Sequence, residues 1–196
     1  MKPFSESCER NKQPILSVIE TLLETKQSLL EIGSGTGQHA TFFAEQLPHI
    51  TWHTSDRLEN HGDIHLWIDD SPAANIKTPI QLDVFEDKWP EQQFDAVFSA
   101  NTAHIMSWQA VQSLFKGVGN ILQKHGFFML YGPFNYNGKF TSKSNENFQR
   151  WLKSVDPQRG IRDFEAVDLL AKNAAMKLLQ DYEMPANNRI LVWQKI

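Results

Sequence analysis

The sequence predicts an α/β fold in which a mostly parallel, seven-stranded sheet is covered by helices on both faces. Three observations support this prediction. Short apolar runs alternate with stretches that repeat apolar residues at helical spacing, which is typical of right-handed crossovers between parallel strands. A glycine-rich turn, residues 33–37, connects the first apolar run to a helix. The last two runs are joined only by MPANN, which is too short for a crossover and therefore predicts an antiparallel hairpin.

Apolar residues three and four positions apart indicate which stretches are helical. The first stripe runs from Ile15 to Leu23, and Pro14 stands in its opening turn, where proline is tolerated. The second stripe ends near Pro48, which cannot continue a helix. The predicted helices are residues 14–23, 40–47, 61–70, 108–122, 145–153 and 164–173.

Short apolar runs between turn residues indicate strands that are buried on both faces. The predicted strands are residues 28–32, 50–55, 79–84, 94–100, 126–131, 177–183 and 189–194. From residue 132 to residue 163 the composition shifts toward Gly, Asn and Ser, especially before residue 145. These residues favour turns, so we expect loops to dominate this part of the chain.

Composition and charge exclude several classes of protein. The chain of 196 residues is 41% hydrophobic and 21% charged, which predicts one globular domain over residues 1–196. The formal net charge is −4 and the basic residues are dispersed, so no nucleic-acid partner is expected. No stretch has the apolar length of a secretory signal or a membrane span. Cys8 is the only cysteine, so no intramolecular disulfide can form, and we expect a cytoplasmic protein without a membrane partner.

The glycine-rich turn stands where open α/β sheets bind ligands, beyond the carboxyl end of the first strand. Gly33 and Gly35 would adopt backbone angles that other residues avoid and would keep Cβ atoms away from a ligand. Gly37 would let the following helix pack close to the strand. Asp56 ends the second predicted strand about 20 positions later, where a carboxylate can accept hydrogen bonds from ribose hydroxyls. The alternatives are a tight connection with incidental glycines and an exposed turn aspartate.

Two ligand classes fit such a turn, a dinucleotide and an adenosyl sulfonium. Dinucleotide sites use Gly-x-Gly-x-x-Gly to present helix amides to a pyrophosphate. The turn here reads GSGTG, so its third glycine comes two residues after the second rather than three. The spacing therefore favours S-adenosylmethionine (SAM), and a nicotinamide-dependent oxidoreductase stays as an alternative.

The segments LLEIGSGTG, HTSD, IQLDV and FDAVFSANTAHI resemble those of class I SAM-dependent methyltransferases, which fold as a Rossmann-like three-layer sandwich. The resemblance implies SAM as cofactor and S-adenosylhomocysteine (SAH) as product. It implies that Glu31 lies near the amino end of the methionine moiety, that Asp83 lies beside the adenine amino group, and that Val84 supplies a backbone contact. The complete set of expected cofactor-binding residues is Glu31, Gly33, Ser34, Gly35, Gly37, Asp56, Asp83, Val84, Asn101 and Ala103.

A closer resemblance covers nearly the whole chain. ERNKQPIL, LYGPFNYNGKFTSKSN, DPQRGIRD and MPANNRILVW, in this order, resemble the small family known as domain of unknown function 938, or methyltransferase-like 26. That family is named for its fold and motifs, so the resemblance implies no particular reaction.

Candidate catalytic residues follow two of the central strands. His104 follows the fourth predicted strand, and the near-neutral pKa of histidine suits a general base. Tyr131 ends the fifth strand and could donate a hydrogen bond. The competing interpretation is that both side chains are simply packed or exposed. His61 and His65 share a helical face without an HExxH pattern, so no metal site is expected.

The expected substrate-binding residues come from the two polar regions beside the predicted sheet edge. Residues 1–26 should form a helical lid whose polar segment precedes the first helix, and residues 132–163 should form loops on the substrate side. Arg159 and Arg162 could clamp a carboxylate or phosphate, although a salt bridge within their loop explains them equally well. The candidates are Arg10, Asn11, Asn135, Tyr136, Arg159 and Arg162.

These patterns predict a SAM-dependent methyltransferase that acts on a small-molecule acceptor. Methyl transfer from an activated sulfonium needs alignment and exclusion of water more than a covalent nucleophile or a metal. The faint acid–base signature leaves open a non-catalytic SAM-binding or partner protein of the same fold.

Overall fold

The computed structural model describes residues 2–196, which form a central seven-stranded sheet with the strand order β3-β2-β1-β4-β5-β9-β8. Strands β1 to β5 are parallel, and β9 pairs antiparallel with both β5 and β8. The α/β class and the antiparallel C-terminal hairpin are therefore confirmed. The strands are β1 (Ser28–Ile32), β2 (Thr51–Asp56), β3 (Ile76–Gln81), β4 (Phe94–Ala100), β5 (Leu122–Gly132), β8 (Met176–Met184) and β9 (Asn188–Lys195).

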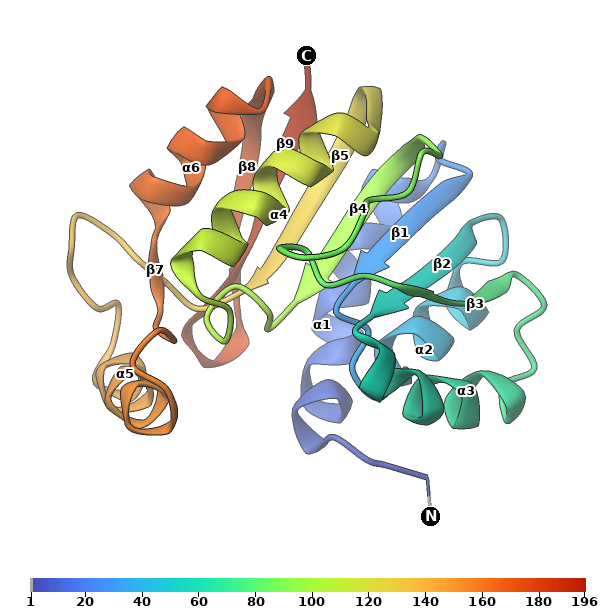
Figure 1. The fold of residues 1–196 in the computed structure, drawn as a ribbon, viewed down its shortest axis with the longest axis horizontal. Coiled ribbons are helices and arrows are strands. Elements are labelled where there is room, and N and C mark those ends of the chain that lie inside the picture. The colour runs from blue at the N-terminus through green and yellow to red at the C-terminus, as the bar shows by residue number, and fades with distance from the viewer. Residues whose placement is uncertain (1) are drawn as a thin grey trace.

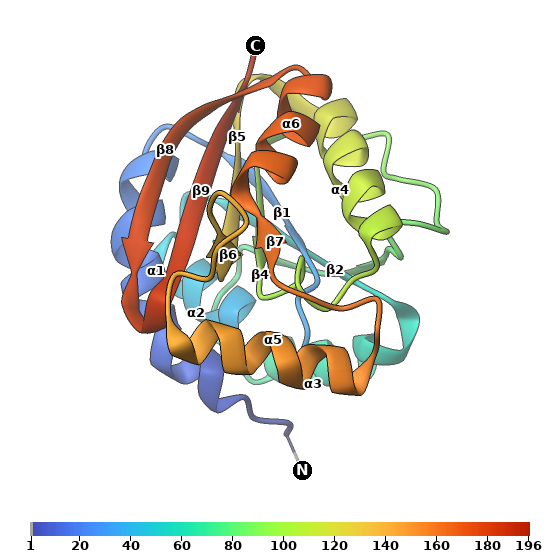
Figure 2. The same ribbon diagram turned by 90° about the vertical axis from the view of Figure 1, so that its left-hand side faces the viewer.

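Helices cover both faces of the sheet, as Figures 1 and 2 show. Helices α1 and α2 pack on one face, and α4 and α6 pack on the other. Helix α3 packs against α2 and the edge strand β3. Helix α5 lies beyond the carboxyl ends of the parallel strands (Figure 2). The helices are α1 (Glu6–Leu23), α2 (Gln38–Gln46), α3 (His61–Asp69), α4 (Trp108–Ile121), α5 (Lys143–Val155) and α6 (Phe164–Asn173).

Two short strands tie the region around α5 together. Strands β6 (Phe134–Asn135) and β7 (Arg162–Asp163) pair in parallel outside the main sheet. Within residues 2–196, no helix combines the length and the apolar character that a membrane crossing requires.

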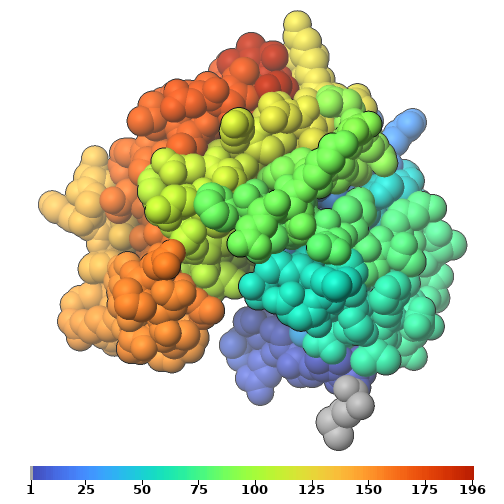
Figure 3. Space-filling view, in the orientation of Figure 1, coloured from blue at the N-terminus to red at the C-terminus, as the bar shows by residue number. Residues whose placement is uncertain are grey.

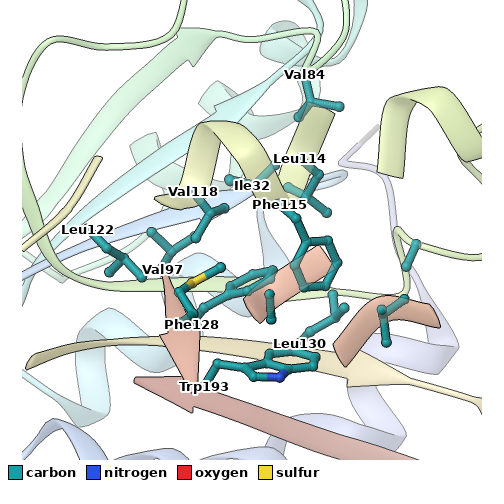
Figure 4. Close-up of a cluster of buried hydrophobic side chains, with 14 of the residues drawn as sticks. Ile32, Val84, Val97, Leu114, Phe115, Val118, Leu122, Phe128, Leu130 and Trp193 are labelled. Carbon is teal, nitrogen blue, oxygen red and sulfur yellow. The ribbon is translucent and has the colours of Figure 1, made fainter. Parts of the chain in front are cut away.

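The alternation of side chains along β5 divides the core between the two helical layers. Phe128 faces α4 and α6, whereas the next residue, Met129, faces α1 and α2. Figure 4 shows Phe128 in the first of these clusters, with Phe115 from α4 and Trp193 from β9. The centroids of the three rings lie 5.2–5.7 Å apart, so aromatic packing fixes α4 against the hairpin strand.

Three predicted elements differ from the observed ones by three residues or more at one end, and one of them is β5, which begins at Leu122 rather than at residue 126. The first helix begins at Glu6 rather than at Pro14, and the hydroxyl of Ser5 accepts a hydrogen bond from the Cys8 amide as its cap. The polar first turns have no continuous apolar stripe, so periodicity does not detect them. Strand β3 runs from Ile76 to Gln81 rather than from residue 79 to residue 84, and Pro79 is tolerated because β3 is an edge strand.

Candidate functional site

A cavity of about 560 Å³ lies beyond the carboxyl ends of the parallel strands. Figure 3 shows the surface hollowed between α5 and the start of α1. The loops after β1, β2, β3 and β4 supply most of the wall. The lining residues are Ser5, Ser7, Cys8, Ile32, Gly33, Ser34, Gly35, Thr36, His39, Asp56, Arg57, Asn60, Leu82, Asp83, Val84, Phe85, Glu86, Ala100, Asn101, Thr102, Ile105, Met106, Ser107, Ala110, Asp156 and Arg159.

Gly35 exposes bare main chain to this cavity. Its φ is +59°, and a Cβ atom built on it would meet no other group within 4 Å. Its amide donates a hydrogen bond of 2.7 Å to Oδ2 of Asp56, which connects the glycine turn to the end of β2. The turn is therefore held by hydrogen bonds while its surface stays clear of side chains.

Gly37 serves a different purpose from the one expected. A Cβ atom at Gly37 would lie 3.1 Å from the Cα of Ile64 and 3.1 Å from the Cβ of Trp67, both on α3. The expectation that Gly37 brings α2 close to its strand is therefore corrected: the missing side chain lets α3 approach the start of α2. Gly37 does not line the cavity.

The Asp56 carboxylate is buried and held by main-chain and side-chain donors. Oδ1 accepts 2.8 Å hydrogen bonds from the Arg57 amide and from the Asn60 side chain, and Oδ2 accepts the Gly35 amide. A carboxylate offers about four lone-pair sites, so these three bonds leave acceptor capacity for a ligand hydroxyl. Asp56 is not the exposed turn residue of the alternative interpretation, because only 8% of its surface is exposed.

Glu31 lies behind the glycine turn rather than in the cavity wall. The Ser34 hydroxyl donates to its Oε2 at 2.9 Å, and Nε1 of Trp52 donates to the same oxygen at 3.2 Å. Burial raises the pKa of Glu31 to about 7 despite these two bonds, and the nearby Asp56 charge acts in the same direction. A cation in the cavity beside Ser34 would favour the ionised form of this carboxyl group.

The loop after β3 places Asp83 and Val84 in the cavity wall, beside Leu82. Oδ1 of Asp83 accepts a 2.9 Å hydrogen bond from the amide of Phe85, so this carboxylate shapes its own turn. Asn101 after β4 also lines the cavity and has a φ of +60°. Ala103 is buried and is absent from the wall.

The two candidate catalytic residues lie outside the cavity wall. Only 6% of the surface of His104 is exposed, and its ring packs edge-on against Phe148 at 5.2 Å. Burial, with the charges of Arg162 and Arg159, lowers the pKa of His104 to about 4, so the imidazole is neutral at pH 7. Tyr131 is buried as well, and burial raises the pKa of its hydroxyl. Their catalytic roles stay predictions.

Most of the expected substrate-binding residues also lie elsewhere. Arg10 is on the exposed side of α1 and pairs with Glu6 at 3.2 Å. It is part of the helix, which corrects the expectation that a separate polar segment precedes it. The Tyr136 hydroxyl donates to Asp181 at 2.7 Å, away from the cavity. Asn135 is buried in β6, where its Oδ1 has no hydrogen-bond partner among residues 2–196.

Asn11 reaches the site indirectly, through a histidine that sequence patterns did not single out. Oδ1 of Asn11 lies 2.6 Å from Nε2 of His39, and His39 lines the cavity. Burial, with the charge of Lys12, lowers the pKa of His39 to about 4. No local signal reveals this pair, because the two residues belong to different helices.

Arg159 and Arg162, expected to act as one clamp, have separate roles. Nε of Arg162 donates to the carbonyl of Ala103 at 3.0 Å, and its guanidinium also donates to the carbonyl of Met106. Arg162 is therefore engaged with the loop after β4, and the salt bridge expected within its own loop is not among the ion pairs found within residues 2–196. Arg159 alone lines the cavity.

Replacing Arg162 with glutamine should destabilise the fold. The Arg162→Gln variant would leave the carbonyls of Ala103 and Met106 without their charged donor, and we expect a loss of about 2 kcal/mol in the free energy of unfolding. Urea unfolding monitored by tryptophan fluorescence measures this loss. Arg150→Gln on α5, which removes an exposed ion pair with Glu146, should cost well under about 1 kcal/mol. Equal stability of the two variants would contradict the assignment.

The cavity includes other residues that sequence reasoning missed. Ser5, Ser7 and Cys8 enter the wall because α1 begins earlier than predicted. Ile105 and Met106 enter it through the path of the loop after β4. Ile105 is the last residue of the segment FDAVFSANTAHI, but whether its side chain faces the cavity depends on the path of the loop.

The fold is shared with solved methyltransferases. An O-methyltransferase family protein from Burkholderia thailandensis superposes with a TM-score of 0.85 at 10% sequence identity, covering 97% of this chain and 57% of that one. Human N-acetylserotonin methyltransferase in complex with SAM gives 0.80 at 16% identity, with 97% and 53% covered. This chain thus spans a little over half the length of these proteins. At such identities the likeness shows the fold, which is that of the class I methyltransferases.

A sequence comparison identifies the family itself. Residues 2–195 match the family described as "Protein of unknown function (DUF938)". This match includes the glycine turn, the loops of the cavity wall and the C-terminal hairpin. Because it spans nearly all of the sequence, the chain belongs to the DUF938 family.

Proposed function

We propose that this protein is a SAM-dependent methyltransferase that acts on a small-molecule acceptor. The single observation that carries the proposal is the bare main chain at Gly35 facing the cavity, with the Asp56 carboxylate fixed beside it at 2.7 Å. This arrangement removes side chains where an adenosyl group would lie and supplies an acceptor for its ribose hydroxyls.

The residues present fit SAM in chemical type. Asp56 would hold the ribose, Leu82 and Val84 offer an apolar wall to the adenine, and Asp83 stands beside them. The cavity volume of about 560 Å³ lies within the range of small-molecule sites. When bound, SAM supplies a methyl group that is already activated by its positive sulfur. The protein then has to orient the acceptor and exclude water.

Proton removal, where an acceptor requires it, has a candidate close to the wall. His104 is neutral at pH 7, but a pKa of about 4 makes it a weaker base than a histidine with the usual pKa. Because His104 lies outside the cavity wall, the loop after β4 would have to rearrange for its ring to touch an acceptor. We therefore expect that its substitution lowers turnover without lowering cofactor affinity.

Calorimetry tests the cofactor assignment directly. We expect SAH and SAM to bind with one site per chain and dissociation constants well below about 1 mM. NADH should show no saturable binding, because the turn lacks the Gly-x-Gly-x-x-Gly spacing that binds a pyrophosphate. Absence of heat from SAM and SAH, or tight NADH binding, would overturn the proposal.

A non-catalytic SAM-binding protein is the second candidate. It is favoured by the burial of His104 and Tyr131, which leaves both out of the cavity wall. This candidate predicts cofactor binding with no label transferred from SAM to any small molecule. The narrower identification with methyltransferase-like 26 depends on the four sequence segments quoted above and stays a prediction.

A further inference from the structure

An arginine without a counter-ion stands at one end of the cavity. Arg159 is half-buried, and its Nε is fully buried without a hydrogen-bond partner among residues 2–196. None of the ion pairs found within that range involves Arg159. A partly desolvated guanidinium with an unused donor is unfavourable in the free protein, and an oxyanion would satisfy both its charge and its donors.

Acidic groups are concentrated at the opposite end of the cavity. Asp56 ends β2, and Asp83 and Glu86 follow β3, at the sheet edge farthest from β5. Arg159 instead lies beside the loop after β4. The nearest acidic lining residue in sequence, Asp156, uses its Oδ1 to accept the Gln158 amide at 2.8 Å. Most acidic lining residues therefore lie toward the expected cofactor end, and Arg159 is the basic lining residue toward α5, where Asp156 also lies.

The chain that directly follows Arg159 is anchored. The Gly160 amide donates to the carbonyl of His104 at 2.9 Å, and Arg162 binds the carbonyls of Ala103 and Met106. These bonds fix the segment that carries Arg159 against the loop after β4. Little main-chain ordering remains to oppose binding at this arginine.

Apolar side chains from the loop after β4 line the same cavity as Arg159. Ile105 is 45% exposed, and Met106 is partly buried beside it. An entirely polar ligand would leave these surfaces in contact with water or with its own polar groups. Together with Arg159 they fit a molecule that has an apolar body and one oxyanionic group.

We infer that the methyl acceptor is an organic anion whose carboxylate or phosphate is bound by Arg159 while its apolar body lies against Ile105 and Met106. This inference rests on the proposed function, because it assigns the acceptor of that reaction. Arg162 takes no part in the contact. The positive charge at Arg159 selects the acceptor by charge, and the anchored loop orients it.

Binding of three matched aromatic probes tests the inference without any turnover. Benzoate, phenyl phosphate and the neutral benzamide are titrated into the SAH-loaded and the free protein, with the Nε–Hε signal of Arg159 followed by nuclear magnetic resonance. We expect saturable shifts with benzoate or phenyl phosphate and affinity at least about tenfold weaker for benzamide. If benzoate binds more tightly than phenyl phosphate, the acceptor carries a carboxylate. The reverse order indicates a phosphate.

Matched variants separate recognition from folding. Arg159→Gln should lose anion binding about tenfold or more while keeping its fold and its affinity for SAH, because the side chain makes no ion pair. Arg150→Gln removes the same charge from the exposed side of α5 and should bind like the unmodified protein. Equal binding of benzamide, undiminished binding by Arg159→Gln, or no saturation by either anion at about 50 mM would overturn the inference.

Methyl transfer gives an independent readout. A deproteinised cell extract is separated by anion exchange before incubation with radiolabelled SAM and the protein. Label should enter the retained, anionic fraction and be lost with Arg159→Gln. Label confined to the unretained fraction overturns the inference and leaves the methyltransferase proposal intact. Failure of SAH to bind overturns the proposed function. Anion binding at Arg159 is still tested in that case, because the probes are also titrated into the free protein.

Discussion

Gly35→Leu should abolish SAM and SAH binding, with a loss of affinity of more than about 100-fold, in a protein that still folds. The added side chain meets no protein group within 4 Å of its Cβ, so it projects into the cavity where the adenosyl group is proposed to lie. Calorimetry measures the affinity, and circular dichroism measures the fold. Normal cofactor binding by this variant would contradict the assignment of the glycine turn.

The chain provides a matched control at Gly138. This glycine also has a positive φ, +68°, and its Cβ would also meet nothing within 4 Å, but it lies outside the cavity wall. Gly138→Leu therefore carries the same backbone strain, about 1–2 kcal/mol, without an effect on the ligand. We expect both variants to lose similar stability and only Gly35→Leu to lose binding.

SAH binding should strengthen as the pH rises toward 7, by up to about tenfold per pH unit, because of Glu31. Burial raises the pKa of Glu31 to about 7, so the carboxyl group is protonated below that pH in the free protein. A ligand with a positive ammonium group favours the ionised form, and binding must then release a proton. Calorimetry between pH 5.5 and 7.5, in two buffers with different ionisation enthalpies, measures the affinity and the proton release.

Glu31→Gln separates this effect from other titrations. The amide can still accept the hydrogen bonds from Ser34 and Trp52, but it cannot ionise. Its SAH affinity should be nearly flat over the same pH range. The lowered pKa values of His39 and His104, about 4, keep these two residues neutral there. An equal slope in both proteins would show that Glu31 is not the group responsible.

Glu31 should also make the free energy of unfolding decrease as the pH rises. Because its pKa in the folded protein is raised from 4.5 to about 7, the stability that Glu31 contributes is fully present below pH 4.5 and is lost as the pH rises through 7. Urea unfolding at pH 5.5 and 7.5 should show this decrease in the unmodified protein and a smaller one in Glu31→Gln.

Much of the fold was predictable because local rules determine it. Helical spacing predicted α4 to within one residue of its observed end, and the short MPANN connection predicted the antiparallel pairing of β8 with β9. The placement of Gly33, Gly35 and Asp56 at one cavity follows from the rule that parallel strands end at the same edge of a sheet. Each of these inferences needs only neighbouring residues and the geometry of the sheet.

The site was less predictable where contacts join distant segments. Nothing local distinguishes Arg159 from Arg162, yet one lines the cavity and the other holds the carbonyls of Ala103 and Met106. The bond between Asn11 and His39 likewise depends on how α1 crosses α2.

The sequence by itself determined the order of the elements, the chemical type of the glycine turn and the carboxylate beside it. Only the tertiary structure decided that His104 is buried, that Gly37 makes room for α3 and that Arg159 faces the cavity. The physical reason is that backbone conformation and periodicity depend on nearby residues. The orientation of a side chain depends instead on loop paths and on partners that lie far away in the chain.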